Sequence, residues 1–140
     1  MVETEKEPRF INLHDAIKID ERGLIYFPFQ GEVDQSFGWE VLESFHLVSL
    51  LPGQTRGNHL HPNKIEWLYV FNGEGQFYWT NDQGQLRQKL LQGDQTMVII
   101  PPGIPHALKN DRAGVLYLLA WRVAEEEDVS APDTIPEAII

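Results

Sequence analysis

Two histidines separated by one residue, with a glutamate close behind them, constrain this chain more than any other feature. His59 and His61 lie at positions i and i+2, which share one face of a β-strand about 6.5 Å apart along the backbone. Residues 62–64, Pro-Asn-Lys, form a turn-like segment that can reverse the chain before Glu66. A hairpin of this kind would return the carboxylate to the two imidazoles. The stretch therefore predicts a strand–turn–strand unit that gathers three metal-ligating groups.

A third imidazole comes from His106, which follows the rigid turn Pro101-Pro-Gly-Ile-Pro. Three His and one Glu form a mixed nitrogen and oxygen ligand set that suits one divalent ion such as Zn, Ni, Mn or Fe. A lone buried His is more often a hydrogen-bonded core residue than a ligand. His14 and His46 do not lie in a motif that supplies further ligands, so we interpret them as structural or surface residues.

The stretch 53–73 resembles the first motif of the cupin superfamily, which spaces two Gly around HxH and Glu. Its positions are matched by Gly53, His59, His61, Glu66 and Gly73. The stretch 93–110 resembles the second motif, with Pro101, Gly103, His106 and Asn110 in place. One departure is that seven residues separate Gly93 from Pro101, where the family usually has five; a change of two keeps the alternation of strand faces. The resemblance implies an RmlC-like jelly roll, an all-β barrel that binds a metal.

The remaining sequence independently favours an all-β barrel or sandwich. Short β-branched and aromatic runs recur at near-regular spacing between Gly, Pro and Asn turns. Pro28 confines the run 24–29 to a sheet edge or a strand end. We predict strands at residues 10–15, 24–29, 39–51, 58–61, 66–71, 76–80, 85–91, 96–100 and 114–123.

The predicted domain organisation is one barrel between two tails. Residues 1–9 are expected to be a flexible N-terminal tail, 10–123 the cupin barrel, and 124–140 an acidic, solvated C-terminal tail. Cupins of this type commonly pair through sheet edges, and the apolar run 24–29 would be a hazard if it were exposed. We therefore expect a homodimer.

The composition of the chain argues against several classes of binding partner. The formal net charge is −10, which argues against nucleic acid or an anionic membrane surface as a partner. Cys is absent, so no disulfide framework or thiolate ligand exists. Residues 1–8 contain no apolar segment typical of a signal peptide, and no apolar run approaches the length of a membrane helix. These features predict a cytoplasmic protein with a small-molecule ligand.

A narrower resemblance concerns function. The turn 20–23 and the run Thr55-Arg-Gly-Asn-His59 are similar to cupins that act on nucleotide-linked sugars. These are the dTDP-4-keto sugar 3,5-epimerases, the 3,4-ketoisomerases and the C-terminal domain of capsule-precursor sugar-nucleotide reductases. The resemblance implies proton abstraction beside a carbonyl, with Arg56 near the diphosphate. A guanidinium can bind phosphate or carboxylate through two parallel hydrogen bonds.

The two resemblances conflict at His59. In the epimerases the His after Arg-Gly is the general base, whereas the cupin pattern makes His59 a metal ligand. A nitrogen that binds metal cannot also take a proton. We favour His59 as a ligand, which leaves the base to a metal-bound hydroxide, a Tyr or another group that the sequence does not name.

Three functional classes remain open. The first is an epimerase or isomerase of a nucleotide-linked keto sugar. The second is an Fe(II)- or Mn(II)-dependent oxygenase, because the ligand set leaves coordination positions free. The third is a module that binds a small sugar or acid without turning it over. The fold itself does not choose among them.

Overall fold

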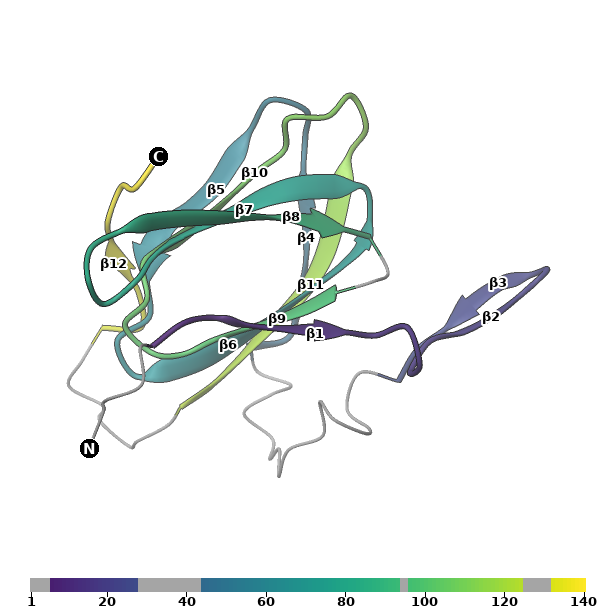
Figure 1. The fold of residues 1–140 in the computed structure, drawn as a ribbon, viewed down its shortest axis with the longest axis horizontal. Coiled ribbons are helices and arrows are strands. Elements are labelled where there is room, and N and C mark those ends of the chain that lie inside the picture. Colours follow the sequence, from purple (N-terminus) through teal and green to yellow (C-terminus); the bar gives the residue numbers. More distant parts are fainter. Residues whose placement is uncertain (1–5, 28–43, 94–95, 125–131) are drawn as a thin grey trace.

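A computed structural model of the protein describes residues 6–27, 44–93, 96–124 and 132–140. The regular elements of these residues are all β-strands, which confirms the expected all-β jelly-roll fold (Figure 1). They are β1 (Arg9–Asn12), β2 (Lys18–Asp20), β3 (Gly23–Ile25), β4 (His46–Leu50), β5 (Thr55–Leu60), β6 (Lys64–Asn72), β7 (Glu74–Thr80), β8 (Leu86–Gln92), β9 (Thr96–Ile100), β10 (His106–Lys109), β11 (Leu116–Ala124) and β12 (Ile135–Pro136).

Two antiparallel sheets form the barrel. The first sheet has the strand order β1-β9-β6-β11-β4, and the second has the order β12-β5-β10-β7-β8. Neighbouring strands are mostly distant in sequence, as in β6 beside both β9 and β11. This interleaving places the two His-bearing motifs next to each other, since β5 and β10 are paired in the second sheet.

The barrel interior is an apolar core contributed by both sheets. β7 alternates strictly between buried and half-buried residues, the signature of a strand with one face on a core. Phe77 from the second sheet and Leu116 from the first are both fully buried. Apolar burial of about 25 cal/mol per Å² makes such aromatic and branched side chains the main stabilising contribution to the sandwich.

The outer face of the first sheet is also covered. A second cluster is formed there by Leu13, Trp67, Tyr69, Met97, Ile99 and Trp121. A sheet buried on both faces needs apolar residues at successive positions rather than in alternation. This explains the continuous apolar runs of β6 and β9, which a strict two-residue pattern would not predict.

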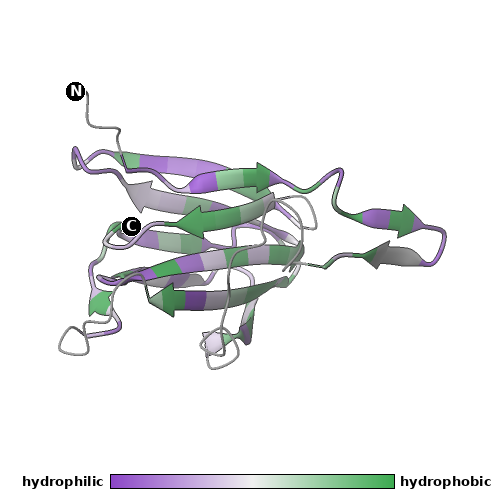
Figure 2. Cartoon of the chain, turned by 90° about the horizontal axis from the view of Figure 1, so that it is seen from below, coloured by the Kyte–Doolittle hydropathy of each residue, from purple (hydrophilic) through white to green (hydrophobic). Residues whose placement is uncertain are grey.

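The hairpin formed by β2 and β3 projects away from the barrel (Figures 1 and 2). Within the run predicted as a strand at 24–29, β3 ends at Ile25. Residues 28 and 29 lie outside the described residues. The first part of the strand predicted at 39–51 also lies outside them, and β4 covers His46–Leu50.

The described residues near both ends of the chain make contacts with the barrel. Arg9 begins β1, and the carboxylate of Glu7 accepts a hydrogen bond from the Trp79 indole. At the other end, Ile135 pairs with Leu60 on the edge of β5. An exposed strand edge offers unpaired backbone groups, which explains why this segment docks there although its side chains remain exposed. The division into three domains otherwise stays a prediction.

Residues 137–140 continue along the same edge. The backbone N–H of Glu137 donates to the carbonyl of Asn58 at 2.7 Å, and the Asn58 side-chain oxygen accepts from Ile139 and Ile140. Residues 135–140 are thus anchored beside the first motif. No helix among the described residues is long and apolar enough to cross a membrane.

Candidate metal centre

The local fold of the first motif depends on a close approach between β5 and β10. Gly57 has φ +96°, and a Cβ there would lie 2.9 Å from both the His106 carbonyl oxygen and the Ala107 Cα. Real side chains do not fit at that distance, so this position requires Gly. The next residue, Asn58, has φ 55°, a left-handed conformation that Asn tolerates better than most residues. The Arg-Gly-Asn-His run therefore brings His59 directly opposite His106.

The structure brings together the four residues predicted as metal ligands. One ligand atom from each of His59, His61, Glu66 and His106 lies within 4.8 Å of all the others. His59 and His61 come from β5 and the residue after it, His106 begins β10, and Glu66 lies on β6 of the opposite sheet. The cluster consequently spans the space between the two sheets, at one end of the apolar core, and can hold a metal ion.

Two backbone carbonyls set the proton positions on the imidazoles. Nδ1 of His106 lies 2.9 Å from the Ile104 carbonyl oxygen, and Nδ1 of His61 lies 3.0 Å from the Asp133 carbonyl oxygen. A carbonyl only accepts, so both Nδ1 atoms carry the proton and the lone pair of each neutral ring is at Nε2. This is the arrangement in which outer-shell partners usually hold metal-ligating histidines.

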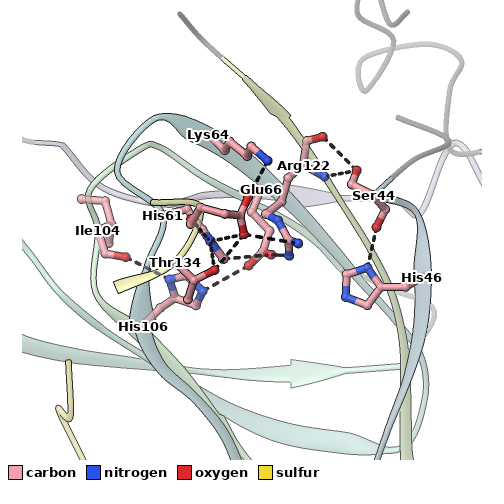
Figure 3. Close-up of polar contacts among 10 residues, drawn as sticks. Ser44, His46, His61, Lys64, Glu66, Ile104, His106, Arg122 and Thr134 are labelled. Atoms are coloured by element: carbon pink, nitrogen blue, oxygen red, sulfur yellow. Dashed lines mark hydrogen bonds and ion pairs between the residues drawn. The ribbon is translucent and has the colours of Figure 1, made fainter. Parts of the chain in front are cut away.

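The two Nε2 atoms converge on the carboxylate of Glu66, as Figure 3 shows. His106 Nε2 lies 3.1 Å from Oε1, and His61 Nε2 lies 3.3 Å from Oε2 without completing a hydrogen bond. A lone pair that faces a carboxylate is repelled unless a proton or a cation lies between them. The buried, unsatisfied Nε2 of His61 therefore fits a cation-binding site.

The side chains of the cluster shift one another's pKa values. Burial raises the pKa of Glu66, but its interactions with the imidazoles of His106 and His61 outweigh burial and hold that pKa well below its usual value. Burial lowers the pKa of His61, but the adjacent Glu66 carboxylate outweighs this and raises it. Burial, followed by the charges of His106 and His61, outweighs the opposing effect of the Glu66 carboxylate and lowers the pKa of His59 to about 4. At neutral pH the cluster thus offers a carboxylate and at least one neutral imidazole.

Arg122 is a component that sequence reasoning missed. It pairs with Glu66 across β11 and β6, and its Nη1 lies 3.2 Å from Glu66 Oε2. A signal was available, because Leu118, Ala120 and Arg122 alternate along one strand and so face the barrel interior together. A charge on the inward face of a core strand needs a buried partner, and here the partner is Glu66.

The C-terminal segment closes one side of the cluster. The Asp133 carboxylate is an ion-pair partner of Lys64 and lies 3.7 Å from Nη2 of Arg122. The Thr134 hydroxyl donates to Asp133 Oδ2 and lies 3.2 Å from His61 Nδ1. Residues 133 and 134, which the sequence suggested were part of a solvated tail, therefore fix the orientation of His61.

A cavity of about 480 Å³ opens beside the cluster. This volume is within the usual range for a small-molecule site. Its lining combines the ligand side chains His59, Glu66 and His106 with Arg122, Arg56 and apolar residues of both sheets. It also includes His46, which we had interpreted as structural or surface. Arg56 is exposed, and its Nε donates to the Ser49 carbonyl at 3.1 Å.

Comparison with protein families agrees with this geometry. Residues 46–122, more than half of the 140-residue chain, match the family described as the cupin domain. The chain belongs to the cupin family. This cupin has no match among curated proteins.

Solved structures resemble this cupin at low sequence identity. The capsular polysaccharide assembling protein CapF from Staphylococcus aureus is 27% identical over 68% of this chain, with a TM-score of 0.59. This cupin spans only 26% of the CapF chain. A 3,4-ketoisomerase from Helicobacter canadensis is 16% identical, with a TM-score of 0.71 over 94% of this chain and 92% of its own.

A further similar structure is a mutant of the 3,4-ketoisomerase QdtA from Thermoanaerobacterium thermosaccharolyticum, in complex with TDP-4-keto-6-deoxyglucose. It is 19% identical, with a TM-score of 0.69 over 91% of this chain and 86% of that one. The two ketoisomerases show that the fold is shared along nearly the whole chain.

The ion pairs of Asp133 predict a pH-dependent contribution to stability. Burial raises the pKa of Asp133, but hydrogen bonds from Lys64 and Thr134 outweigh it and lower the pKa from 3.8 to about 2. A lowered folded-state pKa stabilises the fold above pH 3.8, and this contribution is lost as the pH falls towards about 2. Asp133→Asn should therefore lower the melting temperature of the metal-free protein at pH 7. The difference from wild type should shrink below pH 4, as measured by calorimetry.

Asp82→Asn, on the exposed turn after β7, is the matched control and should leave the melting temperature unchanged at both pH values. A deficit in Asp133→Asn of equal size at pH 7 and at pH 3 would show that the carboxylate charge is not what stabilises this corner.

Proposed function

We propose that this cupin is a metal-dependent isomerase or epimerase of a nucleotide-linked keto sugar. One observation carries the proposal: the His59–His61–Glu66–His106 cluster lies on the wall of a small-molecule cavity that also holds two arginines. A divalent ion and guanidinium groups are the means by which a protein binds phosphate and stabilises an enolate. The fold shared with two 3,4-ketoisomerases, one of them in complex with TDP-4-keto-6-deoxyglucose, supports the same substrate class.

In this proposal the four clustered residues hold one divalent ion, such as Zn, Ni, Mn or Fe. The ion would supply positive charge next to the substrate carbonyl. Glu66 offers the anionic ligand, and Arg122 offsets the charge on its second oxygen. The Ile104 and Asp133 carbonyls hold two imidazoles with Nε2 inward, so the site is organised before metal binds.

Removal of the ligands tests the metal site. The double variant His61→Ala, His106→Ala should bind divalent metal much more weakly, beyond the roughly 10- to 100-fold typical for loss of an outer-shell partner. Elemental analysis after purification and calorimetric titration would measure this loss. His14→Ala, an exposed residue near β1, is the control and should keep the wild-type metal content. Full occupancy in the double variant would mean that the ion binds elsewhere.

Arg56 is the residue we assign to the diphosphate. It is exposed at the start of β5, lines the cavity, and has its Nε held by the Ser49 carbonyl. No other hydrogen bond or ion pair among the described residues engages its guanidinium, so the two terminal nitrogens can face a ligand. A protein of net charge −10 needs such a local positive group to bind a dianionic substrate.

Arg56→Ala should weaken binding of a nucleotide sugar by roughly 10- to 100-fold, because hydrogen bonds to charged groups contribute about 1.5–3 kcal/mol. Arg56→Lys should restore part of the affinity, since the charge remains but the planar fork is lost. Arg112→Ala is the control, because Arg112 pairs with Glu74 and lies outside the cavity lining. Isothermal titration with TDP would measure all four proteins. Equal affinities for Arg56→Ala and wild type would remove Arg56 from the binding site.

A turnover assay tests the function itself. Metal-loaded protein would be incubated with TDP- and UDP-linked 4-keto-6-deoxy sugars and followed by NMR for ring isomers. Conversion supports the proposal. The ligand set also suits an Fe(II) or Mn(II) oxygenase, which oxygen uptake by the Fe(II)-loaded protein would reveal. Ligand binding without turnover or oxygen uptake would instead indicate a binding module.

We also propose that this cupin is a homodimer. The projecting β2–β3 hairpin exposes Ile19, Ile25 and Phe27 at 73%, 56% and 56% of their surface. Contact with a second copy would cover these side chains. Ile19→Lys with Ile25→Lys should convert the dimer to a monomer in light scattering, whereas Leu86→Lys, exposed on β8, should not. A wild-type protein that stays monomeric across concentration would overturn the dimer.

A further inference from the structure

His46 faces the cavity from the strand at the edge of the first sheet. Along β4 the residues alternate, so that Leu47 is 61% exposed while Val48 and Leu50 pack into the barrel core. His46 shares the inward face with Val48 and Leu50 and lines the cavity. His46 is the first residue of β4 and pairs with Ala120 of β11. The next residue on the same face of β11 is Arg122, which contacts Glu66, so His46 is the inward residue of β4 nearest to the cluster.

The sheet register places His46 two strands away from β6, the strand that carries Glu66. Leu68, Ala120 and His46 are aligned across β6, β11 and β4. Two strand spacings put the backbones of Leu68 and His46 about 10 Å apart. The residue between them is Ala120, whose small side chain leaves the space above it to the cavity. A ligand bound above Ala120 would have His46 on one side and Glu66 with its partners on the other.

A neighbouring backbone carbonyl sets which ring nitrogen of neutral His46 carries the hydrogen. Nδ1 lies 2.6 Å from the Ser44 carbonyl oxygen, which only accepts, so Nδ1 carries the proton and the lone pair of the neutral ring is at Nε2 (Figure 3). Ser44 is itself fixed, because its hydroxyl donates to the Arg122 carbonyl at 2.9 Å and accepts from the Arg122 N–H at 2.8 Å. No hydrogen bond or ion pair within the described residues engages Nε2 of His46.

The other titratable groups of the cavity are committed elsewhere or are too basic. Glu66, His59 and His106 belong to the proposed metal site, and a nitrogen bound to metal cannot take a proton. The guanidinium groups of Arg56 and Arg122 offer only hydrogen-bond donors and no basic lone pair. No Tyr is among the described residues that line the cavity. His46 therefore remains as the cavity residue with an available basic lone pair.

We propose that His46 is the general base of the isomerisation and that Nε2 is the atom that takes and returns the proton; this inference rests on the proposed function. Nε2 removes the hydrogen from the carbon that bears a hydroxyl beside the carbonyl. The C–H electron pair forms the C=C bond of an enediolate, and the carbonyl π pair moves to oxygen, which then carries the negative charge. That oxygen would lie on the side of the cavity that holds the proposed metal site and Arg122.

The return of the proton completes a balanced step. Nε2 gives the proton to the former carbonyl carbon, the enediolate oxygen there takes up a proton, and the neighbouring hydroxyl loses one as it becomes the new carbonyl. One hydrogen has moved between carbons and one between oxygens, so no oxidant or reductant is consumed. Return of the proton to the original carbon would give exchange with solvent instead.

The test compares wild type with His46→Asn, in which the amide can still donate to the Ser44 carbonyl but offers no base. Metal-loaded proteins would be incubated with TDP- and UDP-linked 4-keto-6-deoxy sugars in D₂O. We expect His46→Asn to lose both isomerisation and deuterium incorporation by about 10²- to 10⁴-fold, the usual contribution of a general base. Metal content, TDP affinity and melting temperature should match wild type. His14→Asn is the control and should keep full activity.

Three outcomes would overturn the inference, and each is distinguishable. Conversion by wild type with undiminished exchange in His46→Asn removes His46 as the base and leaves the proposed function standing. Absence of conversion by wild type for every substrate removes the proposed function and the base with it. A ¹⁵N NMR spectrum of the free protein in which Nδ1 of His46 is the unprotonated nitrogen contradicts the geometry without any substrate.

Discussion

The buried carboxylate of Glu66 is the interaction on which this molecule is organised. An ionised carboxylate that is 5% exposed is strongly unfavourable unless other charges and hydrogen bonds surround it. Here His106 from the second sheet, His61 beyond β5 and Arg122 from the neighbouring strand supply them. Removing one partner of such a buried group typically destabilises a protein by about 3–5 kcal/mol. The same charges that define the site therefore hold the two sheets together at this end of the barrel.

The positions of the site residues depend on the register of the strands that carry them. Glu66 pairs with Arg122 on one side and with Ile100 on the other, and His106 pairs with His59. A slip of one residue in any of these strands would turn a ligand to the outside. The alternating and buried patterns of β6, β7 and β9 oppose such a slip, because it would also expose the core. Apolar packing thus specifies where the polar groups meet.

Much of this was accessible from sequence, for identifiable reasons. The barrel and the clustering of the four candidate ligands could be predicted because HxH, Glu and the second His lie within short motifs whose spacing matches strands and turns. Arg122 and His46 were missed because their relevance depends on pairing between β11, β6 and β4, which are far apart in the chain. The pairing of residues 135–136 with β5 was not predicted, because an acidic, Pro-containing composition is typical of a solvated segment. The free edge of β5 exists only once the sheet has formed.

The hydrogen bond from His61 to Asp133 has a consequence for how the chain matures. The two residues are 72 positions apart, so during synthesis the imidazole emerges long before the carbonyl that orients it. Until the later segment leaves the ribosome and pairs with β5, nothing selects the tautomer of His61 through this contact. In the growing chain, the imidazole of His61 could still rotate after the other three clustered side chains have been made. The four clustered side chains would therefore reach their final arrangement only after residue 133 has been made and its segment has docked.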